Sequence, residues 1–76
     1  MPKDCLKASK AAVKAAKDVE KAWQRFSKEL LKFGVGNSET RQGVKTACYL
    51  AYDSLLQFSK TLGEKHKEYR SECKRQ

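Results

Sequence analysis

The side chains with the most reactive chemistry fall near the two ends of the chain: Cys5, His66, Tyr69 and Cys73. If the chain folds back on itself near residue 36, Cys5 comes within about one helical turn of Tyr69 and Cys73. Cys5, His66 and Cys73 are zinc-binding residue types, but a fourth ligand and a recognised spacing are missing, so we predict no metal and no cofactor. A Cys5–Cys73 disulfide is a stronger hypothesis if the compartment is oxidising. Buried thiols that act as small apolar side chains are the interpretation we favour.

Nothing in the chain predicts catalysis. A nucleophilic thiol needs a neighbouring base and a pocket for a substrate, and a thin helical protein has no concavity to supply one. The glycines between residues 34 and 37 resemble those of a phosphate loop, but they follow a helical pattern instead of a strand. We therefore expect the protein not to be an enzyme.

Composition predicts one small, basic, all-α domain spanning residues 1–76. The chain has 39% hydrophobic residues, 34% charged residues and a net charge of +8, which favours a folded chain with a thin core and a large solvated surface. Its longest uncharged run, residues 46–52, is too short to span a bilayer, so we expect a soluble chain without an export signal. Three cysteines without a CxxC motif fit the cytoplasm or another reducing compartment, with a mature secreted chain as the alternative.

The first half of the chain has the pattern of one long amphipathic helix over about residues 3–33. Its predicted apolar seam has alternating spacings of four and three residues. The seam consists of Cys5, Ser9, Ala12, Ala16, Val19, Trp23, Phe26, Leu30 and Phe33. Gly34 is predicted to end the helix in a left-handed conformation, and residues 34–37 form the turn.

A second helix is predicted from about residue 38 to residue 74, with Asn37 or Ser38 as its N-cap. Its seam continues the same alternation through Val44, Cys48, Ala51, Leu55, Phe58 and Leu62. The seam then shifts to His66, Tyr69 and Cys73, which makes a stutter at Gly63. A break at residue 63 is the alternative to one continuous helix.

The two helices predict an antiparallel, coiled-coil-like hairpin that self-associates. Two helices rarely enclose a core by themselves, so we expect dimerisation to complete a four-helix bundle. Further apolar side chains stand beside the seam: Leu6, Val13 and Leu31 on the first helix, and Tyr49, Tyr52 and Leu56 on the second. The alternative is that they only broaden the stripe for one partner helix. The predicted self-association residues are Tyr49, Tyr52, Leu56, Trp23 and Phe26.

Nine basic residues form a ladder along the first helix, opposite its predicted seam. They are Lys3, Lys7, Lys10, Lys14, Lys17, Lys21, Arg25, Lys28 and Lys32. A straight ridge of positive charge about 45 Å long suits the phosphates of nucleic acid or the head groups of an anionic membrane. Lysine outnumbers arginine by 13 to 4, which favours diffuse electrostatics over the reading of a base sequence. A simply solvated helix face is the alternative, as is ionic pairing with the acidic row of a second copy: Glu64, Glu68 and Glu72.

No motif in the chain identifies a family. The leading hypothesis is a self-associating helical module that presents a basic surface to an anionic membrane or to nucleic acid. An assembly subunit with a protein partner and no polyanion ligand is the main alternative. A third is a membrane-perturbing peptide that opens its hairpin to insert the seam.

Overall fold

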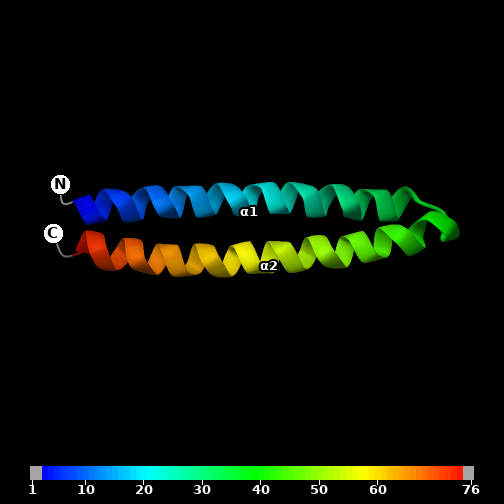
Figure 1. Cartoon of the computed structure of the whole chain (residues 1–76). Coiled ribbons are helices and arrows are strands. Elements are labelled where there is room, and N and C mark those ends of the chain that lie inside the picture. Colours follow the sequence, from blue (N-terminus) through cyan, green and yellow to red (C-terminus); the bar gives the residue numbers. More distant parts are fainter. Residues whose placement is uncertain (1–2, 75–76) are drawn as a thin grey trace.

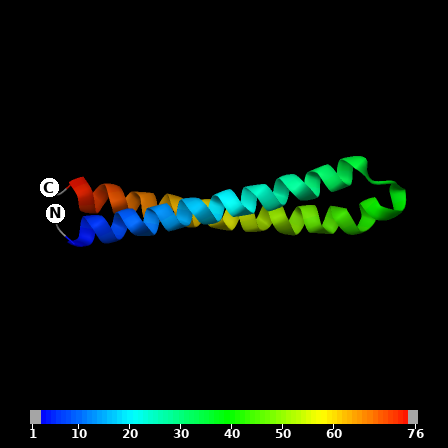
Figure 2. The same ribbon diagram turned by 90° about the horizontal axis from the view of Figure 1, so that it is seen from above.

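A computed structural model of the chain describes residues 3–74, and these form an antiparallel helical hairpin. Helix α1 spans Lys3–Val35 and helix α2 spans Ser38–Lys74. The helices run side by side along their whole length and both ends of the chain lie together (Figure 1). Seen from above, they cross at a shallow angle (Figure 2). The result is a straight rod of 57 × 13 × 12 Å, and the predicted all-α hairpin is confirmed.

The seam between the helices is built from small side chains. Its buried members are Cys5, Ala8, Ala15, Ala22, Cys48 and Ala51. On α1 the alanines recur every seven residues, so they occupy one core position of a heptad repeat. Because alanine projects so little, the two backbones can approach closely at these positions.

The predicted seam of α1 is therefore only half right. Cys5, Ala12, Val19 and Phe26 do face α2, but the alternate positions are filled by Ala8, Ala15 and Ala22. The predicted occupants of those three positions were Ser9, Ala16 and Trp23, and Leu30 was predicted for the position that the partly buried Glu29 holds. Each lies one residue further along, so α1 is rotated by about 50° from the predicted orientation. Trp23 and Leu30 consequently lie on the surface.

A core of this kind is thin. The chain exposes 6196 Å², whereas a compact monomer of its mass would expose about 4,700 Å². No side chain larger than alanine or cysteine is buried among the described residues. The hairpin thus retains a large apolar surface that it does not cover itself.

The connection is shorter than the predicted turn of residues 34–37, and of the two predicted N-caps Asn37 is the one used. α1 continues to Val35, and no glycine in the described chain has the left-handed conformation predicted for Gly34. Asn37 caps α2, because its side-chain oxygen accepts hydrogen bonds from the backbone N–H groups of Glu39 (3.1 Å) and Thr40 (3.0 Å). Gly36 is needed at the turn, since a Cβ atom there would lie 2.7 Å from the hydroxyl oxygen of Thr40.

Arg41 ties the turn to the end of α1. Its Nε donates a hydrogen bond to the carbonyl oxygen of Phe33 over 3.1 Å, and its guanidinium carbon lies 5.6 Å from the centre of the Phe33 ring. One of the last carbonyls of α1, which has no partner within the helix, is thereby satisfied. The same carbonyl accepts a hydrogen bond from the backbone N–H of Gly36 over 3.3 Å, so Arg41 adds to the contacts that fix the direction in which the chain returns.

Helix α2 is continuous, and the alternative break at residue 63 does not occur. On the side of α2 that faces α1, Leu62 is followed three residues later by Lys65, which is partly buried. His66 is exposed. The predicted stutter is therefore absent, and His66 stands beside the seam.

The open end of the hairpin is closed covalently. Cys5 and Cys73 form a disulfide that joins positions 68 residues apart, with Cα atoms separated by 4.8 Å. Cys5 is 2% exposed, and the hydroxyl of Ser9 donates to its carbonyl oxygen over 2.8 Å. These two cysteines are thus paired, which differs from the favoured interpretation of free buried thiols. Cys48 remains a free, buried thiol in the seam.

Candidate functional site

Large apolar side chains from both helices gather on one side of the rod, which we call the apolar face. Eight of them are between 38% and 59% exposed: Leu6, Val13, Trp23 and Leu30 from α1, and Tyr49, Tyr52, Leu56 and Tyr69 from α2. The alanine seam is the reason, since the rotation of α1 turns Trp23 and Leu30 toward the side where Val13 already lies. Exposed apolar patches of this extent mark interaction surfaces in soluble proteins.

The apolar face protrudes toward the turn end, where aromatic rings cluster. The rings of Trp23 and Phe26 lie 6.3 Å apart, edge to face, and those of Phe26 and Tyr52 lie 5.5 Å apart. Phe26 is half-buried between the other two. The contact with Phe26 positions the indole of Trp23, which is 56% exposed.

The same face is hollowed toward the open end. A groove of about 360 Å³, which we call the open-end groove, runs between the helices there. It is lined by Ser9, Ala12, Val13, Ala16, His66 and Tyr69. The small residues of α1 make the hollow, and the stacked rings of His66 and Tyr69, 6.2 Å apart, form its other wall. Its lining is mostly apolar, so it suits an apolar side chain better than a charged one.

The basic ladder is exposed along α1. The structure describes eight of its nine side chains, all except that of Lys3, and all eight are exposed. Of these eight, only Lys32 forms an ion pair, with Glu29 at 3.3 Å. Within the described residues no ion pair joins α1 to α2, so the ladder is not used to hold the hairpin together.

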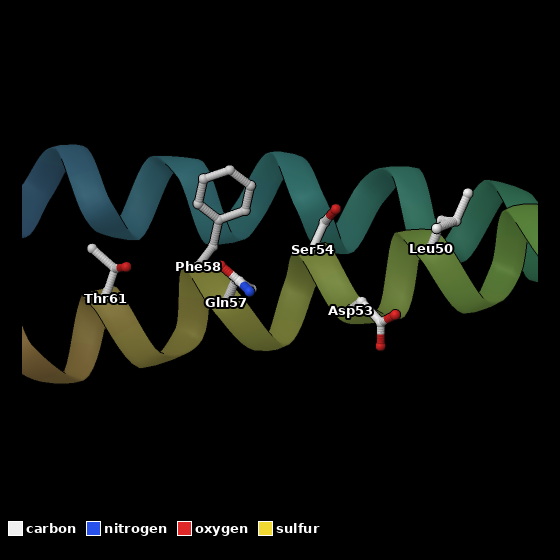
Figure 3. A pocket seen from close by; sticks show the side chains of 6 residues that line it. All are labelled: Leu50, Asp53, Ser54, Gln57, Phe58 and Thr61. Atoms are coloured by element: carbon white, nitrogen blue, oxygen red, sulfur yellow. The ribbon is translucent and has the colours of Figure 1, made fainter.

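The rotation of α1 brings part of the ladder toward the side opposite the apolar face, which we call the charged side. Lys21 and Arg25 edge a shallow hollow of about 220 Å³ with Asp18, over a floor that includes Ala22 and Phe58. A neighbouring hollow, of about 360 Å³, lies on α2 (Figure 3). Phe58 extends from it toward α1, while Asp53 and Gln57 line its outer part. Both hollows are open and hold no arrangement of catalytic groups.

Two of the three members of the acidic row of α2 lie away from the apolar face, and the third, Glu64, lines a separate hollow with Leu56. Glu68 and Glu72 line a hollow on the charged side together with Asp4 and Lys7 of the same chain, and Glu68 also lies 3.8 Å from Lys65. Carboxylates placed there neighbour α1 of their own hairpin. A second copy docking on the apolar face would therefore not meet them.

The fold brings Cys5 together with Cys73 and His66 together with Tyr69, and it places Cys48 elsewhere in the seam. Cys5 and Cys73 are bonded to each other, Cys48 is buried in the seam, and His66 faces the open-end groove. In the described chain no three histidine, cysteine or acidic side chains are placed to bind a metal ion.

Four of the five predicted self-association residues lie on the apolar face, and the fifth, Phe26, is half-buried in the seam beside them. Trp23, Phe26 and Tyr52 are in ring contact, and Tyr49 and Leu56 flank them on α2. Sequence reasoning missed Leu30 and Tyr69, which were assigned to the seam. The exposure of Leu30 could have been inferred from a second apolar set in the sequence. Ala8, Ala15 and Ala22 repeat every seven residues beside the larger residues, and if these alanines fill the seam, Leu30 lies outside it.

No helix among residues 3–74 has an apolar stretch that is long enough to cross a membrane. No protein-family model matches the sequence, and no curated protein or solved structure shows significant similarity to the chain.

Proposed function

We propose that this protein is a non-enzymatic helical module that self-associates through the apolar face and presents the basic ladder to an anionic partner. The observation that supports it best is the separation of the two surfaces. The ladder side chains point into solvent with a single ion pair among the described ones, while the large apolar side chains lie on another side of the rod. A second copy can cover the apolar face and leave the ladder free.

An anionic membrane surface suits the ladder better than duplex nucleic acid. The rod is straight and 57 Å long, so the ladder forms a nearly linear ridge. A flat layer of lipid phosphates can meet the whole ridge, whereas a duplex about 20 Å wide curves its phosphates away from a straight line. Each lysine near such a surface contributes about 1 kcal/mol at physiological salt.

The test measures binding to vesicles that contain anionic phosphatidylserine, to neutral vesicles and to duplex DNA. We expect binding to anionic vesicles that weakens steeply with salt. Lys10, Lys14, Lys17 and Lys21 replaced by Gln should weaken it at least tenfold without loss of helicity. The matched control replaces Lys45, Lys60, Lys67 and Lys74 on α2, which removes the same charge from outside the ladder. An equal effect of both variants would refute the ladder as the binding surface.

Comparing binding to anionic vesicles with binding to duplex DNA separates the alternative functions. Tighter binding to duplex DNA than to anionic vesicles would identify nucleic acid as the partner. Absence of both kinds of binding at low salt would favour an assembly subunit without a polyanion ligand.

A second candidate function is favoured by the position of the aromatic residues. Because Trp23, Tyr49 and Tyr52 already lie on the outside of the closed hairpin, the apolar face can rest in the head-group region without the hairpin opening. This changes the prediction that insertion would require an opened hairpin. Leakage from vesicles together with a blue shift of Trp23 fluorescence at concentrations where the protein is monomeric would support this function over the first.

A further inference from the structure

The apolar face has a symmetry that specifies how a second copy would dock. On α1, Leu6 and Leu30 each lie 12 residues from position 18, and Val13 and Trp23 each lie five residues from it. On α2, the Cys5–Cys73 and Phe26–Tyr52 contacts place residue 60 opposite position 18, and Tyr52 and Tyr69 lie eight and nine residues on either side of residue 60. The four apolar residues of α1 and the Tyr52–Tyr69 pair of α2 are thus nearly symmetric about the middle of the rod, whereas Tyr49 and Leu56 have the polar residues Ser71 and Glu64 at their mirror positions.

The symmetry of the α1 residues suits an antiparallel two-fold dimer, which needs a self-complementary face. In such a dimer residue i of one copy contacts residue j of the other, and j contacts i. We propose that two hairpins pair through their apolar faces about a two-fold axis across the middle of the rod, so that α1 lies antiparallel on α1 of the second copy. Leu6 then meets Leu30, and Trp23 meets Val13, twice each. The arrangement rests on the proposed self-association and adds the identity and orientation of the partner.

The shape of the face agrees with this orientation. The reversal places the protruding Trp23 at the height of Val13 of the second copy, which is in the middle of the open-end groove. The alternative two-fold axis, along the rod, would stack α1 on α2 of the second copy and bring Trp23 against Leu56 and Tyr52. It would then place protrusion on protrusion and leave the two grooves facing each other empty, which packing does not favour.

The size and charge of the face also suit a second copy. Eight large side chains that each expose roughly 100 Å² give about 800 Å², which is the area one partner contributes to a standard protein interface. Glu20 lies two residues after position 18, and Lys17 lies one residue before it. The reversal therefore brings Glu20 near the height of Lys17 of the second copy, which opposes the repulsion between two lysine-rich helices.

A side-chain swap tests the arrangement. Val13→Trp places two indoles in one groove, and Trp23→Val leaves the groove unfilled, so each should weaken the dimer on the order of tenfold. The double variant V13W/W23V restores one large and one small residue at every contact, and its dimer dissociation constant should return to within about threefold of the wild-type value. Leu31→Ala is the matched control, because Leu31 is 70% exposed and lies about 100° around α1 from Leu30.

The measurement is sedimentation equilibrium from 1 μM to 1 mM, roughly the range of weak to moderate dimers, with Trp fluorescence recorded at each concentration. A dimer with a concentration-dependent blue shift and a compensating swap supports the proposal. A dimer in which the two substitutions add without compensation, or that L31A weakens as much as W23V does, overturns the arrangement but not self-association. A monomer with unchanged fluorescence throughout overturns both, whatever the result of the vesicle experiment.

Discussion

The disulfide between Cys5 and Cys73 is expected to supply much of the stability of the single hairpin. It closes a loop of 68 residues, for which the loss of unfolded-chain entropy amounts to about 4 kcal/mol. Few other contacts hold the open end, because the seam there consists of Cys5, Ala8, Ala12 and Ala15, whose side chains bury little apolar area. A domain of this size has a total stability of about 5–10 kcal/mol, so the disulfide represents a large part of it.

The prediction is tested by replacing both residues with serine in a chain that also carries Cys48→Ala. The reference is oxidised Cys48→Ala, which keeps the disulfide and removes the free thiol that could exchange with it. At equal protein concentration we expect Tm to fall by roughly 15–30 °C. Amide exchange should show where the loss occurs, with protection lost first in residues 5–16 and 64–73 and retained near the turn.

Two results would refute this reasoning. A Tm within about 5 °C of the reference, equivalent to roughly 1 kcal/mol, would mean that packing alone holds the open end. A large fall in Tm with equal loss of amide protection along both helices would mean that the hairpin melts as one unit and that its open end is not the weaker part. Reduction of the wild-type chain with a dithiol should reproduce the double serine variant.

Three further predictions concern the turn, and thermal or urea unfolding measures all of them. Asn37→Ala should lower the free energy of unfolding by about 1 kcal/mol because it removes the N-cap, and Ser38→Ala should change it by less than about 0.5 kcal/mol. Gly36→Ala should destabilise by about 1–3 kcal/mol because its Cβ would clash with a threonine hydroxyl, whereas Gly63→Ala meets nothing within 4 Å and should stabilise by about 0.5–1 kcal/mol. Arg41→Lys keeps the charge but loses the guanidinium contacts to the end of α1, and should cost about 1 kcal/mol.

Periodicity was sufficient to predict the helices and their antiparallel return. The alternation of four- and three-residue spacings is long in both halves of the chain, and Asn37 is a strong N-cap between them. The glycines of the turn were harder to assign. Gly34 and Gly36 both fit the end of a helix by type. The structure shows that Gly36 is the one without room for a side chain, because a Cβ atom there would lie 2.7 Å from the Thr40 hydroxyl oxygen and 3.1 Å from the carbonyl oxygen of Lys32.

The seam of α1 was assigned incorrectly because two apolar sets fit the same period. Ala12 and Phe26 belong to both sets. The sets differ at every second seam position, where one set has residues such as Trp23 and the other has residues such as Ala22. Ranking by hydrophobicity selects Trp23, on the assumption that the largest apolar residues are buried within the chain. That assumption fails when the largest apolar residues contact a partner. The sequence of one copy does not show whether such residues pack within the chain or against a partner.

The proposed dimer and the proposed membrane binding should respond to salt in opposite directions. If α1 lies on α1 of the second copy, the two basic ladders run along the same edge of the four-helix bundle, which doubles the charge that faces an anionic surface. The same proximity makes the ladders repel each other, and the pairing of Glu20 with Lys17 of the second copy offsets only part of that repulsion. Raising the salt concentration screens that repulsion and should tighten the dimer, whereas it should weaken attachment to anionic vesicles. If α1 lay on α2 instead, the ladders would occupy opposite edges, and the dimer would gain little from salt. Sedimentation at about 50 mM and 500 mM salt, where the screening length falls from roughly 14 Å to 4 Å, therefore tests the orientation independently of the side-chain swap.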